Sequence, residues 1–194
     1  MSDYSDLDLP PDAVLVRGLL EPDQTFVDSE RFKTAMRAFA TGVVIVTVEV
    51  EGGRLLGLTI NSCCSISTRP PSVLISLAHT ASAREPLLAR GRFGLSILAE
   101  RHRELAELGA VPGGPKEVDV FAERLESVGT AAIAGALAHL DCTVSRTFEV
   151  ADHTLVVGIV DRAVVGDGNP LVYYDREFRR LGEPFPPEKA RPAR

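Results

Sequence analysis

The sequence contains few residues that could build a metal centre or a disulfide scaffold. It has three cysteines, an odd number, with Cys63 and Cys64 adjacent and Cys142 far away. No C-x-x-C or H-x-x-x-H spacing offers a tetrahedral metal site. We therefore expect reduced thiols and no bound metal.

Long hydrophobic runs are also missing. No apolar segment approaches the roughly 18 to 20 residues that a membrane-spanning helix needs. The chain begins M-S-D-Y-S-D-L-D-L-P, which is acidic where a secretory signal peptide would be basic. These two features predict a cytoplasmic protein that does not span a membrane.

Basic patches and the common nucleotide-binding motifs are absent as well. The formal net charge is −6 and lysine and arginine do not cluster, which disfavours binding to nucleic acid or to an anionic membrane. Neither G-x-G-x-x-G after a strand nor G-x-x-x-x-G-K-[S/T] occurs, so the sequence has no Rossmann or P-loop site. A nucleotide would have to bind in another way, with a local basic pocket for its phosphates.

The chain has the size and composition of one globular domain. It has 194 residues, of which 45% are hydrophobic and 25% charged. Pro10, Pro11 and Pro22 among acidic residues predict a mobile N-terminal arm over residues 1–27. Residues 183–194 form a Pro-rich C-terminal tail, so the predicted domain covers residues 28–182.

Several segments have the β-branched or alternating pattern of strands, joined mostly by short turns. They are Val43–Val48, Arg54–Ile60, Val73–Leu77, Phe93–Leu98, His139–Phe148, His153–Val165, Leu171–Tyr174 and Glu177–Leu181. The first is β-branched almost throughout, which predicts burial on both faces. With few helices between the strands, this order favours a mainly β barrel with peripheral helices.

Four short segments have the three-and-four spacing of helices. Ser29 is predicted to cap the first, which Gly42 ends and which packs on the core through its apolar residues Phe32, Ala35, Met36, Phe39 and Ala40. The other three are expected from His79 to Leu88, from Arg101 to Leu108 with Leu105 and Leu108 inward, and from Val118 to Leu125.

A polar seam, Leu55–Ser72, lies between apolar strands. It carries short hydroxyl and amide side chains at Thr59, Asn61, Ser62, Ser65 and Ser67. Small donors let backbone N–H groups approach closely, which suits a wide, flat ligand hydrogen-bonded along its edge. The alternative is an ordinary Ser/Thr-rich connection.

The predicted helix after His79 offers an anion site. Unpaired N–H groups and the helix dipole favour a phosphate at its start, with Ser82 and Arg84 as further donors. The alternative is simple capping by Thr80 or Ser82, with Arg84 solvated.

Four sequence blocks together resemble the flavin reductase-like family. They are F-A-T-G-V-V-I-V-T (39–47), G-L-T-I-N-S-x-x-S-I-S-x-x-P-P (57–71), F-G-L-S-I-L (93–98) and A-D-H-T-L-V-V-G-I-V (151–160). The resemblance implies a flavin-binding split β-barrel of Greek-key type, a homodimer, and NAD(P)H-dependent reduction of FMN or FAD by direct hydride transfer. It also implies a partner monooxygenase that receives reduced flavin. The segment Gly129–Ala138 departs from the family pattern, which puts the nearby pocket wall in doubt.

The resemblance also assigns roles to residues. It implies that the seam from Thr59 to Ser67, including Cys63 by position, binds the isoalloxazine edge and ribityl chain, while Ser82 and Arg84 hold phosphate. His153 is the catalytic candidate that orients NAD(P)H, Asp152 supports its turn, and Phe178 closes over the nicotinamide. Against these roles, a histidine that starts a strand is often structural, and Cys63 and Cys64 are interpreted as packing residues.

Two other functions stay open at this point. The same barrel serves as a flavin-storage or haem-handling protein, or as a non-catalytic partner subunit. The sequence does not distinguish FMN from FAD, NADH from NADPH, or a flavin substrate from a tightly bound prosthetic group.

Overall fold

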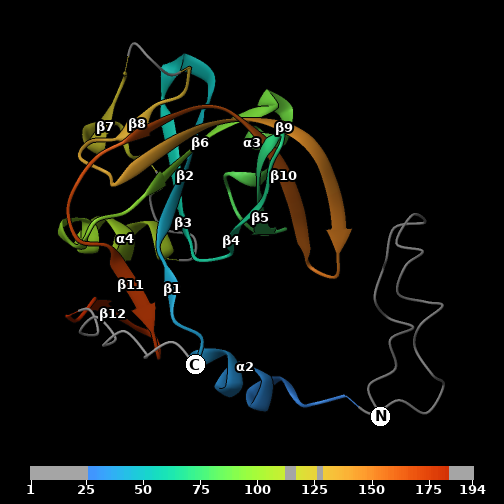
Figure 1. Cartoon of the computed structure of the whole chain (residues 1–194). Coiled ribbons are helices and arrows are strands. Elements are labelled where there is room, and N and C mark those ends of the chain that lie inside the picture. The colour runs from blue at the N-terminus through green and yellow to red at the C-terminus, as the bar shows by residue number, and fades with distance from the viewer. Residues whose placement is uncertain (1–25, 112–116, 126–128, 184–194) are drawn as a thin grey trace, which may run out of the picture.

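The computed structural model describes residues 26–111, 117–125 and 129–183 (Figure 1). Most of the chain forms one seven-stranded antiparallel sheet. Its strands, in spatial order, are β3 (Leu55–Ile60), β2 (Val44–Glu49), β6 (Arg92–Ile97), β9 (Ala138–Val150), β10 (His153–Val165), β5 (Pro71–Ala78) and β4 (Cys63–Thr68). The predicted arm and tail lie almost wholly outside the described residues.

The connection between β3 and β4 makes the sheet curl. These strands occupy opposite edges of the sheet, yet only Asn61 and Ser62 join them. Such a link spans at most about 11 Å, so the ends of the two edges must come together. The sheet therefore forms an open barrel, which confirms the split barrel expected from the sequence.

Two hydrophobic cores lie on either side of β2. Val44, Val46 and Val48 belong to the cluster inside the barrel, which also contains Phe93. Val43 and Ile45 belong to a second cluster, shared with the helix α4 (Arg103–Ala110). Successive strand residues point to opposite faces, so the predicted burial of this strand on both faces is confirmed.

The longest strands, β9 and β10, form a hairpin that links the two halves of the sheet. The first part of β9 pairs with β6, and the first part of β10 pairs with β5. At Gly158 a Cβ would lie 2.7 Å from the Phe93 ring, so glycine is required for this close packing. The fit places the largest core side chain against the middle of β10.

The remaining described strands form two smaller sheets. The first joins β1 (Thr41–Gly42) to the hairpin of β11 (Leu171–Tyr174) and β12 (Glu177–Arg180) that the sequence predicts. The second pairs β7 (Ala122–Glu123) with β8 (Ala132–Ile133). Short 3-10 turns lie at η2 (Glu51–Gly53), η3 (Glu100–His102) and η4 (Asp119–Phe121).

The helix α2 (Ser29–Arg37) differs from the prediction. Asp28, not Ser29, caps it by accepting a hydrogen bond from Arg31 N at 2.9 Å, and it ends before Phe39 and Gly42. None of its residues, all of which the structure describes, is buried, and Figure 1 shows it apart from the large sheet. The apolar spacing indicates a face to be covered but not what covers it.

The helix α3 (Arg84–Arg90) begins later than predicted. Ala83 is its N-cap and makes no side-chain cap bond, while residues 79–82 form turns. Pro86 is tolerated in the first turn of a helix but not in its interior, which explains the late start. The helix begins two residues after Ser82, and neither Thr80 nor Ser82 caps it.

Two further helix predictions need correction. In α4, Leu105 is buried as expected but Leu108 is exposed, because the small residues Ala106 and Gly109 face β3 instead. The segment 118–125 is not an α-helix, since it contains only the short 3-10 turn η4 and the strand β7. Val118 N bonds Leu55 O, and β7 pairs with β8, so strand contacts replace helical ones.

No helix in the described parts of the chain is long and apolar enough to cross a membrane. Within the same residues, no group of three histidine, cysteine, aspartate or glutamate side chains could hold a metal ion.

Candidate functional site

A cavity of about 700 Å³ lies between the end of β3, α4 and the β11–β12 hairpin. Its size falls within the range of pockets that bind small molecules and cofactors. It is lined by Val43, Thr59, Ile60, Asn61, Arg103, Glu107, Ala110, Val111, Tyr173, Arg176, Glu177 and Phe178. Three of the predicted site residues, Thr59, Asn61 and Phe178, therefore share one cavity.

Thr59 is held in the cavity wall by the close approach of α4. A Cβ on Gly109 would clash with Thr59 Oγ1, so this glycine lets the helix pack directly on β3. Thr59 Oγ1 is buried and has no hydrogen-bond partner among the described residues. A buried hydroxyl without a partner is costly, and the close contact with Gly109 shows that this oxygen faces α4.

The β11–β12 hairpin supplies the aromatic wall. Tyr173 and Phe178 face each other across the hairpin with ring centroids 5.3 Å apart. Asp175 and Arg176 both have positive φ, the conformation that a two-residue hairpin turn requires. This turn brings Arg176 to the cavity, opposite Arg103 from α4.

The polar seam is an edge strand rather than a loop. The Ser62 hydroxyl donates to Ser76 O at 2.8 Å, and the Ser67 hydroxyl accepts from Arg69 N at 2.9 Å, so both stabilise the backbone. Asn61 and Ser65 are exposed, and their side chains make no hydrogen bond to any residue that the structure describes. These two retain donors for a ligand along the edge.

The two cysteines of the seam differ. Cys63 packs against the barrel core, as predicted, and burial raises the pKa of its thiol to about 11. Cys64 is exposed, so the packing interpretation is wrong for it. Opposite faces of one strand produce this difference, because neighbouring side chains alternate.

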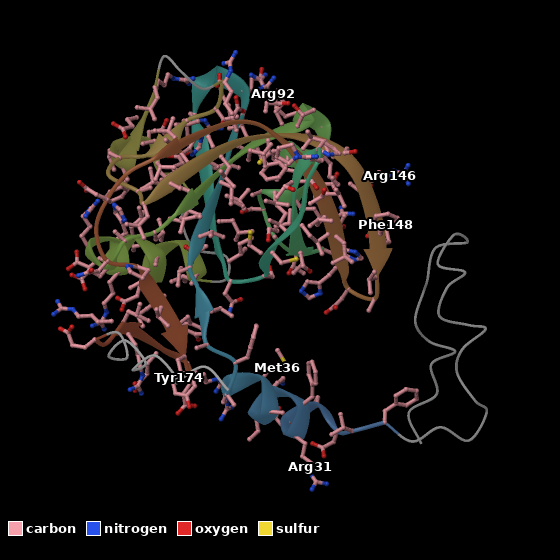
Figure 2. All side chains as sticks on the ribbon, viewed as in Figure 1. Arg31, Met36, Arg92, Arg146, Phe148 and Tyr174 are labelled. Carbon is pink, nitrogen blue, oxygen red and sulfur yellow. The ribbon has the colours of Figure 1, made fainter. Side chains whose placement is uncertain are left out.

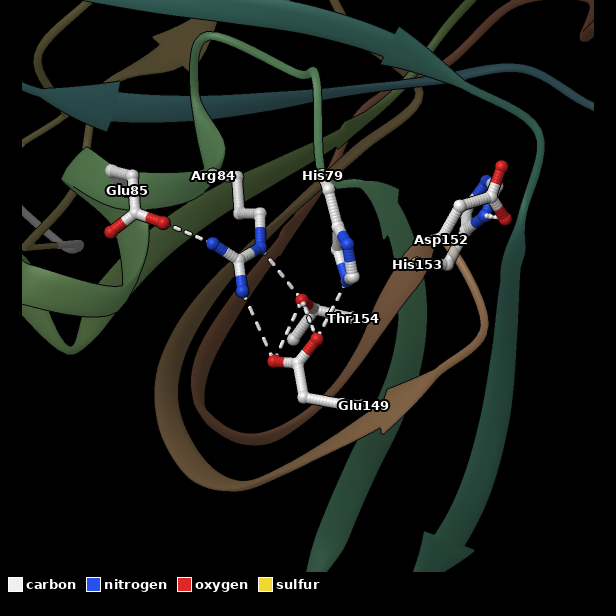
Figure 3. Close-up of polar contacts among 7 residues, drawn as sticks. All are labelled: His79, Arg84, Glu85, Glu149, Asp152, His153 and Thr154. Carbon is white, nitrogen blue, oxygen red and sulfur yellow. Dashed lines mark hydrogen bonds and ion pairs between the residues drawn. The ribbon is translucent and has the colours of Figure 1, made fainter. Parts of the chain in front are cut away.

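A polar cluster closes the far end of β5, β9 and β10 (Figure 3). The Glu149 carboxylate accepts hydrogen bonds from the Thr154 hydroxyl at 2.9 and 3.0 Å and from Arg84 Nη2 at 3.1 Å. His79 Nε2 lies 2.7 Å from Glu149 Oε2, the carboxylate oxygen that Arg84 does not contact. Burial raises the pKa of Glu149, but the bonds from Thr154 and His79 and the charge of Arg84 outweigh it, so the pKa is lowered.

Arg84 is thus not solvated. Its Nε donates to Thr154 Oγ1 at 2.7 Å, and its Nη1 contacts the exposed Glu85. Ser82, the other predicted phosphate ligand, is exposed in the loop between His79 and Arg84. The structure brings Arg84 to Glu149 instead of leaving it free for an anion.

His153 and Asp152 form a separate pair at the β9–β10 turn. His153 Nδ1 lies 2.7 Å from Asp152 Oδ1, and the hydrogen bond from His153 lowers the pKa of Asp152. The His153 side chain is 44% exposed. Figure 3 shows this pair turned away from the Glu149 cluster. A bond to Asp152 orients the imidazole while leaving its other nitrogen available.

The sequence analysis did not identify every residue of the cavity or of the Glu149 cluster. In the cavity it missed Arg103, Glu107, Tyr173 and Arg176, and in the cluster it missed His79, Glu149 and Thr154. Apart from Thr154, which lies in the 151–160 block, these residues belong to none of the motif blocks, and several of their contacts join distant parts of the chain. For the pairs with Arg84, for example, the separation is 65 and 70 residues.

Comparison with known proteins is consistent across sequence and structure. A family model described as "Flavin reductase like domain" matches residues 36–182. An NADH-dependent flavin reductase from Rhodococcus sp. is 35% identical over 167 residues, covering 84% of this chain and 91% of the relative. The reductase component of 4-hydroxyphenylacetate 3-monooxygenase from Thermus thermophilus is 35% identical over 153 residues, covering 78% and 96%.

A solved structure has the same fold. The Streptomyces globisporus NADH:FAD oxidoreductase, in complex with NAD and FAD fragments, superposes with a TM-score of 0.73 at 30% identity. The match covers 82% of this chain and 98% of that one.

Proposed function

Because this chain belongs to the flavin reductase-like domain family, we propose that it is an NADH-dependent flavin reductase. In this proposal it reduces FMN or FAD and supplies the reduced flavin to a partner monooxygenase. Relatives named as reductase components of such two-component systems support the partner. The predicted cytoplasmic location remains part of the proposal.

One observation carries the proposal. Thr59 and Asn61 from the seam and Phe178 from the C-terminal hairpin, which the sequence connects with the flavin and the nicotinamide, line the same cavity. They come from segments more than a hundred residues apart in the chain.

Each residue has a positioning role. Thr59, Asn61 and Ser65 would donate to the flavin edge, and Phe178 would cover the nicotinamide. His153, oriented by Asp152, would hold NADH. Arg84 and Ser82 would meet the flavin phosphate.

The protein itself needs little acid or base chemistry. Bound flavin supplies the electron acceptor and NADH the hydride, so the chain contributes alignment and exclusion of water.

We further propose a homodimer. Three large apolar side chains near α2 remain exposed, Phe32 at 57%, Met36 at 48% and Phe39 at 65%. Figure 2 shows Met36 and Arg31 on opposite sides of this helix, so it has an apolar and a polar side. A second copy of the chain is the partner that we assign to the apolar side.

The decisive experiment mixes the purified protein with NADH and free FMN or FAD and follows NADH oxidation by absorbance. Repeated turnover with excess flavin is expected for a reductase that uses flavin as a substrate. Oxidation of a single equivalent of NADH, limited by bound flavin, would indicate a carrier and overturn the proposal.

A further inference from the structure

The Glu149 carboxylate pairs with the Arg84 guanidinium at 3.1 Å. The same carboxylate accepts a hydrogen bond from the Thr154 hydroxyl and lies beside the His79 imidazole nitrogen. All three contacts are 3.1 Å or shorter. An arginine guanidinium and neighbouring side-chain donors that converge on one small anion can recognise a phosphate group as well. The site is therefore already filled by an anion that belongs to the chain.

The fold holds this arrangement from three elements. Glu149 and Thr154 lie directly opposite each other in the β9–β10 pairing. His79 follows β5, and its N–H donates to Asp152 O at 2.9 Å, which fixes its position beside the β9–β10 turn. Arg84 starts α3, and its side chain is only 17% exposed. The backbone therefore fixes the positions of these residues, and their contacts are not chance contacts between mobile surface groups.

We propose that Glu149 is an internal competitor of the flavin phosphate for Arg84 and His79. This rests on the proposed function. For the phosphate to bind Arg84, it must displace the Glu149 carboxylate, and the two anions repel each other if both stay. Part of the binding free energy of the phosphate is spent on this exchange. Glu149 keeps the flavin exchangeable, as a reductase that releases its reduced product requires.

Riboflavin separates this effect from all others, because it has the same ring and ribityl chain as FMN but no phosphate. Glu149→Gln removes the negative charge and keeps an acceptor for Thr154. We expect this variant to bind FMN about five- to tenfold more tightly, a change typical of one charged hydrogen bond. Its riboflavin affinity should stay the same. Fluorescence titration measures both dissociation constants.

Two further variants complete the test. Glu85→Gln also removes a carboxylate that contacts Arg84, but this side chain is 77% exposed, so the ratio of FMN to riboflavin affinity should change little. Arg84→Gln should lower that ratio, and in the Arg84→Gln/Glu149→Gln double variant the gain from Glu149→Gln should be smaller than in the single variant, because Arg84 is one of the two groups for which Glu149 competes.

Several results would overturn the inference. A Glu149→Gln variant whose FMN and riboflavin affinities change by the same factor makes Glu149 a structural residue only. An unchanged ratio in Arg84→Gln, which is informative even if Glu149→Gln fails to fold, removes Arg84 from phosphate binding. If the wild-type protein binds neither FMN nor riboflavin, the proposed function itself fails, which is a separate outcome.

Discussion

His153 is the residue with the most direct expected part in NADH binding. It lies at the first position of β10, half exposed, with one ring nitrogen held by Asp152. An imidazole fixed in this way can orient a ligand through its free face and its second nitrogen. Thr154, the next residue along the strand, points into the buried cluster instead.

We expect His153→Ala to raise the KM for NADH several-fold, which corresponds to about 1 kcal/mol of lost positioning. The flavin dissociation constant should stay the same, which serves as the internal control. Turnover at saturating NADH should remain measurable, because an obligatory acid would cost about 100-fold or more at any concentration. Steady-state kinetics with each substrate varied measures this. A loss confined to flavin affinity would place His153 on the flavin.

His139 is a buried histidine that does not line the cavity. It is 2% exposed, and its two ring nitrogens lie 3.0 Å from the hydroxyls of Ser96 and Thr130. Burial lowers its pKa, and burial also lowers the pKa of His102. In the window below about pH 6.5 the unfolded chain therefore binds more protons than the folded one, so stability falls as the pH falls.

His139→Gln should weaken this dependence, since glutamine keeps hydrogen bonds but does not titrate there. Urea unfolding of the wild type and the variant at about pH 7.5 and about pH 5.5 tests it. The loss of unfolding free energy between the two pH values should be smaller in the variant. Equal losses would show that His139 does not contribute.

At the scale of elements, β4 combines two roles along one edge. Its inner side chain Cys63 packs on the core, while Ser65 and the preceding Asn61 present donors to solvent. An edge strand with unpaired backbone groups is a ready hydrogen-bonding partner. The strand thus suits the flat edge of a flavin.

Asn61→Leu and Ser65→Leu should each weaken flavin binding by about 1 to 3 kcal/mol, because the polar atoms of the ligand lose a partner. The fold should persist, since both side chains are exposed. Thr68→Leu, an exposed position on the same strand, is the matched control. Unchanged flavin affinity in both seam variants, measured by fluorescence titration, would move the site elsewhere.

The packing of β10 on β6 depends on Gly158. Gly158→Ala introduces a Cβ that would approach the Phe93 ring to 2.7 Å. Overpacking of this kind costs about 1 to 3 kcal/mol, so the free energy of unfolding should fall by this amount. Gly182→Ala, where a Cβ meets nothing within 4 Å, should leave stability almost unchanged. Urea unfolding of the two variants decides it.

For the whole molecule, the position of α2 has the widest consequence. The helix is tied to the body through β1 and through a hydrogen bond from Asp175 N to Arg37 O at 3.2 Å. Its apolar side chains remain exposed in the single chain. A stable assembly is expected to cover them.

Sedimentation at micromolar concentration should show a species of about twice the 20.9 kDa chain mass. The Phe32→Ser/Met36→Ser double variant should shift this species toward the monomer, because α2 buries none of its described residues in its own chain. Arg31→Ser, on the polar side of the helix, is the control. A wild-type protein that sediments only as a monomer refutes the homodimer.

Local patterns in the sequence were sufficient for most strands, several turns and the family. The β-branched run Val43–Val48 specifies a strand through its own backbone preferences, and the two strand-like segments on either side of Asp175-Arg176 indicate a hairpin. The four motif blocks likewise identify the flavin reductase-like fold. Such features depend on neighbouring residues, so a linear reading can find them.

The tertiary structure decided which distant residues meet. The tertiary fold brings Thr59 and Phe178 to one cavity. The pairing of β5, β9 and β10 places the Glu149 carboxylate beside the Arg84 guanidinium. The amphipathic pattern of α2 likewise predicted an apolar side but not its exposure. Contacts of this kind depend on the path of the whole chain, because strand order and helix placement are set by packing between segments and not by the preferences of any one of them.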